Sequence, residues 1–158
     1  MILDVPPKVG TRISSEYSLP KHIIFKIIMP LTKISVPRHL PNTQVTALAI
    51  AIQDGLIKTC NVPPNDLFQL ISRFDSDEMI LDRHFGGFSR SKDACVIEII
   101  FLVGRTDDQK RALFHHITEQ CAYAGFRKDD VMIALVENSY MDWSLGLGVA
   151  YADLHPKN

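Results

Sequence analysis

The second half of this 158-residue chain repeats the plan of its first half, and this repeat limits the possible folds more than any other feature. Each half reads as a strand, a helix and a second strand. The halves register where each helix ends: Asn61 corresponds to Gly125, and Asp66 to Asp130, in both cases 64 positions later (125 − 61 and 130 − 66). Asn and Gly tolerate the left-handed backbone that closes many helices, so the match has a mechanical basis.

In the first half, a β-rich run over 31–36 predicts a strand, and a loop then leads into a helix. Asn42 or Thr43 would cap the start of this helix, and Asn61 would end it before the prolines that follow. A second strand is predicted over 67–72. The apolar positions at helical spacing are Val45, Leu48, Ala49, Ile52 and Leu56.

In the second half, an apolar and β-branched run over 95–103 predicts a central strand. Thr106 and Gln109 form a capping-box pattern that opens a helix, and Gly125 marks its end. Residues 131–136 predict the last strand. The apolar positions of this helix are Leu113, Phe114, Ile117, Cys121 and Ala124.

A β-α-β unit has parallel strands and a right-handed crossover. Two such units predict an α+β fold, with a four-stranded mixed sheet and two helices on one face. The opposite face must find another partner, which favours an oligomer. The expected domain covers 30–158, with repeats over about 30–82 and 94–153. Residues 1–29 lack sustained periodicity and are interpreted as an extension outside this fold, in which only 22–28 could form a short strand.

Charge and cysteine content narrow the class of protein. The net charge is −1 without a run of basic residues, so neither nucleic acid nor an anionic membrane surface is an expected partner. No apolar run is long enough to cross a bilayer, and the first residues do not resemble a secretory signal. The cysteines form no CxxC pair, which favours buried free thiols in a reducing compartment, the cytoplasm.

Other chemical motifs are not found. His115 and His116 have no carboxylate or cysteine partner at ligand spacing, so a metal site is not expected. Gly86-Gly87 is interpreted as a turn rather than a phosphate loop. No cofactor is implied.

Several blocks between Pro30 and Gly148 together resemble the tautomerase superfamily, in particular its branch similar to malonate semialdehyde decarboxylase. The resemblance implies a tautomerase or MIF-like fold, a homotrimer, and catalysis by an amino-terminal proline. The matching blocks are Met29-Pro30-Leu31, Val62-Pro63-Pro64-Asn65-Asp66 with Gln69, Glu78-Met79, Arg90-Ser91, Arg105 with Gln109-Lys110, Ala134-Leu135-Val136-Glu137-Asn138-Ser139, Asp142-Trp143-Ser144, Gly146 and Gly148.

The resemblance also implies roles for individual residues. Pro30 would be the general acid or base, and Asp66 would activate water or polarise the amine. Arg105 would hold a substrate carboxylate, because its planar fork matches that group. Two residues, Trp143 and Leu145, would form an apolar wall.

The first strand-helix loop and the family pattern raise two further points about arginines. Arg38 is the counterpart of Arg105 in that loop and a candidate second carboxylate clamp. The decarboxylase pattern has an arginine two positions before Arg105, where this chain has Val103. A decarboxylase function is therefore less well supported than membership of the superfamily.

Each assigned role has a structural alternative. Pro30 could simply begin a strand, and Asp66, which is repeated at Asp130, could be a turn residue. Arg105 stands beside the capping box, where a solvated charge is common, and Trp143 could belong to ordinary packing.

The predicted function is a cofactor-free tautomerase acting on a small 2-oxo carboxylate. The alternatives are a decarboxylase or hydratase of a small 3-oxo acid such as malonate semialdehyde, and a non-catalytic oligomeric protein. The first residues decide between them, because Pro30 preceded by Met29 has an amide nitrogen that cannot titrate. The active form is predicted to begin at Pro30.

Overall fold

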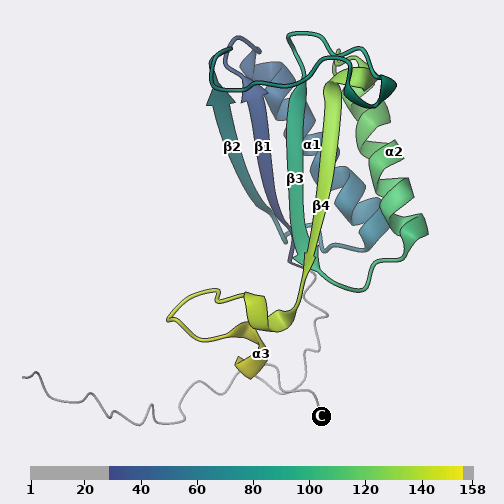
Figure 1. The fold of residues 1–158 in the computed structure, drawn as a ribbon. Helices are drawn as coiled ribbons and strands as arrows, with labels where there is room; N and C mark the ends of the chain where they lie inside the picture. Colours follow the sequence, from purple (N-terminus) through teal and green to yellow (C-terminus); the bar gives the residue numbers. More distant parts are fainter. Residues whose placement is uncertain (1–28, 155–158) are drawn as a thin grey trace, which may run out of the picture.

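A computed structural model describes residues 29–154, so the strand expected over 22–28 lies outside the described residues. The fold follows the repeated plan (Figure 1). The longer elements are β1 (Leu31–Pro37), α1 (Asn42–Cys60), β2 (Phe68–Phe74), β3 (Cys95–Leu102), α2 (Asp107–Tyr123) and β4 (Val131–Asn138). The short helices are η1 (Phe85–Gly87), η2 (Lys128–Asp130), η3 (Tyr140–Asp142) and α3 (Tyr151–Leu154).

The four strands form one mixed sheet in the order β2-β1-β3-β4. Each half contributes a parallel pair, β1 with β2 and β3 with β4, and the central pair of β1 and β3 is antiparallel. The two halves are therefore related by an approximate two-fold axis between β1 and β3. The predicted fold class is confirmed.

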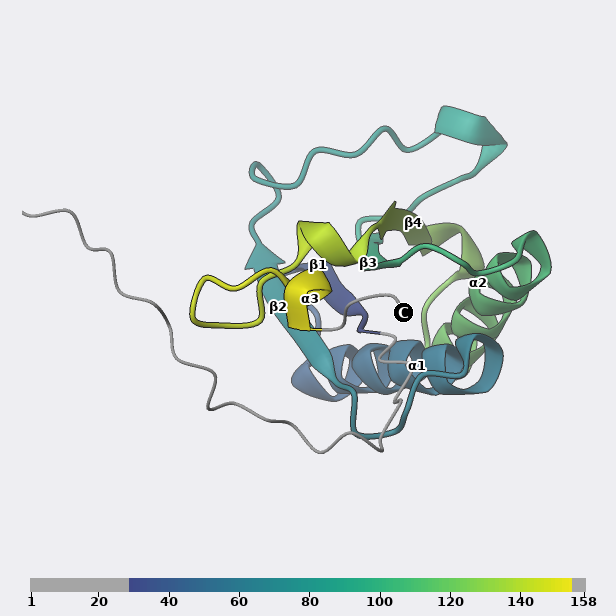
Figure 2. The same cartoon turned by 90° about the horizontal axis from the view of Figure 1, so that it is seen from below.

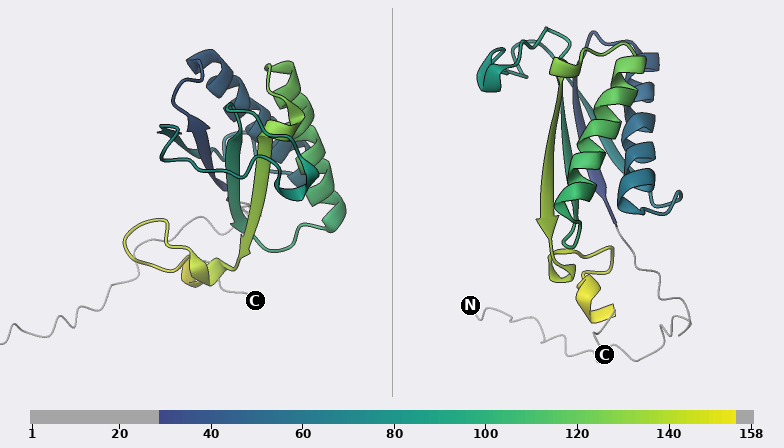
Figure 3. Two further views of the ribbon diagram at one scale, coloured as in Figure 1. Left: turned by 45° about the horizontal axis from the view of Figure 1, so that its top comes forward. Right: turned by 90° about the vertical axis from the view of Figure 1, so that its right-hand side faces the viewer.

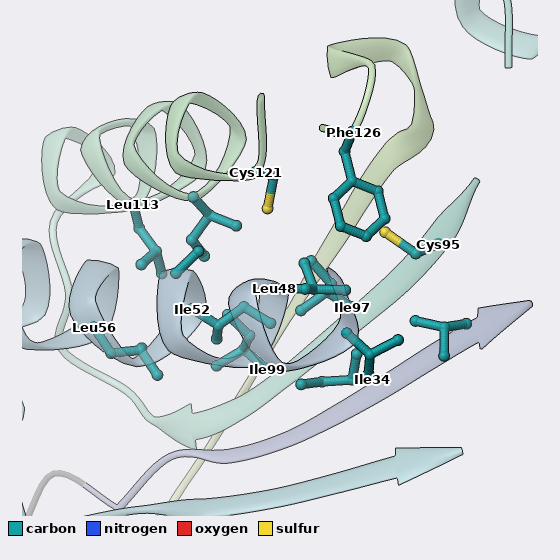
Figure 4. Packing of buried hydrophobic residues seen from close by; sticks show 14 of the residues in the cluster. Ile34, Leu48, Ile52, Leu56, Cys95, Ile97, Ile99, Leu113, Cys121 and Phe126 are labelled. Atoms are coloured by element: carbon teal, nitrogen blue, oxygen red, sulfur yellow. The ribbon is translucent and has the colours of Figure 1, made fainter. Parts of the chain in front are cut away.

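Both helices cover the same face of the sheet (Figure 3). The side chains that alternate toward this face are fully buried in the central strands, among them Ile34 of β1 and Ile97 and Ile99 of β3. They pack against Leu48 and Ile52 of α1 (Figure 4). Burial of this apolar area supplies the main driving force for folding.

The three cysteines complete this core, as predicted. Cys60, Cys95 and Cys121 are buried and carry free thiols. Burial raises the pKa of the Cys95 thiol and of the Cys121 thiol to about 12.

The helix ends agree with prediction in most details. Asn61 is left-handed, with φ of 56°, and closes α1, while Gly125 has φ of 87° after α2. Thr106 and Gln109 form the predicted capping box. The predicted cap of α1 is wrong, because Pro41 holds that position and no side chain caps the helix. Asn42 is already helical, and its side-chain oxygen accepts a hydrogen bond from Arg73 instead.

One apolar position of α2 also differs from the prediction. Phe114 is 36% exposed, whereas Leu113, Ile117 and Cys121 are buried. Phe114 follows Leu113 by one position, about 100° around the helix, and lies at the edge of the sheet beside β4. None of the helices in the described part of the chain is long and apolar enough to cross a membrane.

The face of the sheet away from the helices is open and largely apolar. Phe68 and Leu70 of β2 and Met132 and Val136 of β4 are exposed there. Lys33 and Glu98, which are paired in the register of β1 and β3, form an ion pair of 2.7 Å on this face.

Candidate active site

One edge of the sheet brings together residues that lie far apart in the sequence. β1 and β2 begin at this edge, and β3 and β4 end there, because β1 is parallel to β2 and antiparallel to β3. Pro30 precedes β1, Asp66 lies just before β2, and Arg105 follows β3. The view from below in Figure 2 looks onto this edge, where the segment from η3 to α3 is also found.

Pro30 is buried where the first strand begins, and Met29 before it is only 5% exposed. In the full chain the nitrogen of Pro30 is joined to Met29 and is an amide without a proton. This position can act as an acid or base only when Pro30 is the first residue.

Asp66 is held by its backbone at the exit of α1. Its N–H donates to the carbonyl of Pro63 at 3.0 Å, and its carbonyl accepts from Gln53 at 3.2 Å. Burial raises the pKa of the Asp66 carboxyl, and the nearby charge of Arg105 opposes this shift. The Asp66 carboxyl and the Arg105 guanidinium are therefore close enough to influence each other.

Arg105 lies flat over the ring of Phe101, with 4.5 Å between the guanidinium carbon and the ring centre. Its Nη1 donates to the carbonyl of Leu102, and its Nη2 is buried without an acceptor among the described residues. Burial lowers the pKa of the guanidinium, and the Cys60 thiol and Glu137 carboxylate act in the opposite direction. The Cys60 sulfur, although near, does not have hydrogen-bond geometry to Nη2.

The surroundings limit what Arg105 can bind. Glu137 is already paired with Lys110 at 2.7 Å, so its charge is partly compensated. A buried donor without an acceptor costs free energy, and an anionic ligand would provide the missing acceptor.

The closing segment builds one side of the site. Trp143 donates from Nε1 to Asn138 at 2.7 Å, and its carbonyl accepts from the N–H of Tyr151 at 2.7 Å. Leu145 is 52% exposed, so within one chain Trp143 is the better ordered part of the predicted apolar wall.

Two tyrosines near the site had not been singled out in the sequence. Tyr140 and Tyr151 stack with 5.6 Å between their ring centres. Burial, and then the proximity of Tyr140 and Asp66, raise the pKa of the Tyr151 hydroxyl. Tyr140 directly follows the block that ends at Ser139, which was a usable signal. Nothing in the local sequence marks Tyr151, because only the fold of the closing segment brings it to Asp66.

Arg38 is not brought to this edge. It follows β1, a strand of 7 residues that spans roughly 23 Å, and therefore lies at the opposite end of the sheet from Arg105. Its Nε is paired with Asp75 at 2.8 Å, and this hydrogen bond raises the pKa of the guanidinium. Within one chain, Arg38 and Arg105 do not meet at one ligand. Arg38 lines a cavity of about 460 Å³ at its own end.

Comparison with known proteins gives consistent results. The family model described as "Tautomerase enzyme" matches residues 66–146. The "Probable tautomerase YusQ" of Bacillus subtilis (strain 168) is 31% identical over 123 residues, which cover 77% of this chain and 97% of that relative.

Solved structures show the same likeness. The structure of FG41 malonate semialdehyde decarboxylase inhibited by 3-bromopropiolate has a TM-score of 0.71 and 33% identity, over 78% of this chain and 95% of that one. A second malonate semialdehyde decarboxylase, studied for its decarboxylase and hydratase activities, has a TM-score of 0.69 and 31% identity, over 76% and 93%.

Proposed function

Because the chain belongs to the tautomerase enzyme family, we propose that it is a cofactor-free tautomerase acting on a small 2-oxo carboxylate, with Pro30 as its general acid and base. The observation that carries this proposal is the convergence of Pro30, Asp66 and Arg105 at one edge of the sheet. The second decarboxylase structure supports the role of proline, because it includes a variant of that enzyme in which the first residue, a proline, is replaced by alanine.

The proposed reaction moves one proton from carbon to oxygen. Arg105 binds the substrate carboxylate through its unpaired Nη2. The neutral amine of Pro30 removes a proton from the carbon beside the carbonyl, and the carbonyl oxygen gains a proton as the enol forms. Asp66 is the proposed donor to that oxygen, because burial raises the pKa of its carboxyl and keeps it protonated to higher pH. Proton exchange with water restores both groups.

This reaction requires that Pro30 be the first residue of the active form. An α-amino group has a pKa near 8, so a modest shift decides whether Pro30 acts as base or acid. Burial favours the neutral amine, and so does the positive charge of Arg105, whereas a charged Asp66 favours the cation.

Decarboxylation or hydration of a small 3-oxo acid is the second candidate. Identities of 33% and 31% to two malonate semialdehyde decarboxylases favour it. Val103, in place of the first arginine of the family pattern, leaves one fewer cation to hold a departing carboxylate, and for this reason we place tautomerisation first.

We propose a homotrimer in which the open apolar face of the sheet is covered by the other two copies. Phe68, Leu70 and Val136 would then leave contact with water. Buried free thiols suit a reducing compartment, so the proposed location is the cytoplasm.

The experiment compares the 158-residue chain with a form that begins at Pro30, each verified by intact mass. Ketonisation of phenylpyruvate enol and decarboxylation of malonate semialdehyde are measured for both. We expect turnover only from the form that begins at Pro30, and a loss of about 100-fold or more when Pro30→Ala is introduced into it. Pro41→Ala at the start of α1 is the matched control, because Pro41 is exposed and lies beyond the far end of β1.

The possible outcomes separate the candidates. Faster turnover of malonate semialdehyde than of the enol would favour the decarboxylase. Equal turnover by both verified forms, or by Pro30→Ala, would exclude the amine mechanism. Inactivity of the Pro30 form on both substrates, without labelling of Pro30 by a 3-halopropiolate, would indicate a non-catalytic protein.

A further inference from the structure

A cavity of about 460 Å³ lies at the edge of the sheet opposite Pro30. The loop after β1 and the connection between the two halves form its walls. Its lining includes apolar residues, among them Met79, Leu81 and Ala94, and several cations. A cavity of this size holds a small organic molecule.

The sequence repeat relates this cavity to the candidate active site. Ala94 follows Pro30 by 64 positions (94 − 30), and Met79 precedes Trp143 by the same number (143 − 79). Leu81 precedes Leu145 by 64 as well. The residues that correspond to the catalytic proline and to both residues of the predicted apolar wall therefore line the cavity.

A hydrogen bond repeated after each half supports this correspondence. The N–H of Asp75 donates to the Glu78 carboxylate at 2.8 Å, and the N–H of Ser139 donates to the Asp142 carboxylate at 2.7 Å. The two pairs are again 64 positions apart. The approximate two-fold axis that exchanges the halves thus carries the candidate active site onto the cavity.

The groups proposed for proton transfer have no working counterpart in the cavity. Ala94 is internal to the chain, and its amide N–H donates to the carbonyl of Ser91 at 3.4 Å. Asp130, the counterpart of Asp66, is 1% exposed and accepts from the N–H and the hydroxyl of Ser91 at 2.6 and 2.7 Å. The cavity therefore lacks both a titratable amine and an accessible carboxyl at these positions.

The positive charge, in contrast, is present. Arg38, Arg83, Arg90 and Lys92 line the cavity, with Asp75 as the acidic residue among the lining. Within residues 29–154, neither Arg83 nor Lys92 forms an ion pair. The Nε of Arg90 is buried without an acceptor. Such a lining attracts a carboxylate.

We propose that this cavity is a second binding site, which holds a small carboxylate of the substrate class without converting it. The choice of ligand rests on the proposed function, whereas the site itself rests on the cavity, its charge and the two-fold relation. Apolar contact with Met79 and Leu81 would hold the body of the ligand, and the cations would hold its carboxylate.

The test follows backbone amide signals by nuclear magnetic resonance while pyruvate is added to the full chain. We expect shifts at Met79, Leu81 and Ala94 that saturate. The double variant Arg83→Gln, Lys92→Gln should weaken this binding by about tenfold, because it removes two charged partners on exposed side chains. Arg111→Gln is the matched control, since Arg111 is an exposed arginine of α2 outside the cavity lining.

The readout is independent of turnover, so failure of the enzyme assay and failure of this inference are distinguishable. Absence of saturable shifts around the cavity would overturn the proposal, including the case in which a neighbouring copy fills it. Shifts that the double variant and the control weaken equally would also overturn it. Conversion of pyruvate at the cavity, seen as activity that persists in Pro30→Ala and is lost in the double variant, would contradict the claim that the site is non-catalytic.

Discussion

At the scale of single residues, Arg105 is the side chain whose surroundings most clearly indicate a ligand. Phe101 supports one face of the guanidinium, Leu102 satisfies Nη1, and Nη2 has no acceptor among the described residues. A planar cation held in this way is arranged before the ligand arrives, which reduces the entropy lost on binding.

The first prediction concerns the shape of this cation. Arg105→Lys keeps the positive charge but loses the planar fork and the stacking on Phe101, so KM for the enol should rise about tenfold while kcat changes less. Steady-state kinetics of the form that begins at Pro30 would measure this. Arg111→Lys on the outer surface of α2 should leave both constants unchanged, and an unchanged KM in Arg105→Lys would argue against a carboxylate site there.

The second prediction uses the pH dependence of stability. Burial raises the pKa of the Asp66 carboxyl, so the folded protein binds this proton more tightly than the unfolded chain does. The free energy of unfolding therefore falls as pH rises through this titration, above the unfolded value of about 4. Asp66→Asn lacks this loss and should gain stability relative to the wild type as pH rises, which urea unfolding at a fixed protein concentration would measure.

Asp142 offers a comparison of opposite sign. Hydrogen bonds from the N–H and the hydroxyl of Ser139 lower the pKa of its carboxyl, so its contribution to stability is present above about pH 4 and is lost as pH falls through the folded value. Asp142→Asn should therefore be less stable than the wild type at neutral pH and approach it in acid. Parallel behaviour of the two variants would refute the assignment for Asp66.

At the scale of elements, the close packing of α1 against α2 holds the core together. Gly55 of α1 faces α2, and a Cβ placed there would lie 3.0 Å from Ile117 and 3.2 Å from Leu113. These distances are shorter than van der Waals contact, so Gly55 permits a close approach of the helices. A hydrogen bond between His116 and Asp54, 2.7 Å long, lies at the same contact.

The third prediction follows from this approach. Gly55→Ala improves helix propensity by about 1 kcal/mol, but overpacking against two buried side chains costs about 1–3 kcal/mol. We expect a net loss of about 1 kcal/mol in the free energy of unfolding, measured by urea denaturation. Ile50→Ala, at a position of the same helix that is 63% exposed, should change stability by less than the core variant. A gain in stability from Gly55→Ala would show that the helices can separate without cost.

At the scale of the whole molecule, one face of the sheet is covered and the other is not. Phe68 and Leu70 on one edge and Met132 and Val136 on the other present apolar area to water on the open face. An ion pair between Lys33 and Glu98 lies between them. Apolar area of this kind, interrupted by a single ion pair, is typical of a surface that contacts another subunit.

The fourth prediction tests the role of the open face. Val136→Lys places a charge on it and should shift the protein from trimer to monomer in sedimentation experiments, because a buried unpaired charge is costly. Tyr123→Lys, at a residue of α2 that is 84% exposed and away from this face, should leave the assembly intact. A Val136→Lys variant that remains trimeric would place the interface elsewhere.

The sequence alone determined the order of the elements, the mixed sheet, the helix stops at Asn61 and Gly125 and the capping box at Thr106, because each of these depends on residues close together in the chain. It did not reveal that Arg73 takes the side chain of Asn42 away from a capping role, or that Arg38 and Arg105 lie at opposite ends of the sheet. These depend on the antiparallel pairing of β1 and β3, which reverses the second half relative to the first. Only that tertiary contact decides which distant residues share a site: Tyr151 lies near Asp66, and the counterparts of the active-site residues line a cavity at the other end.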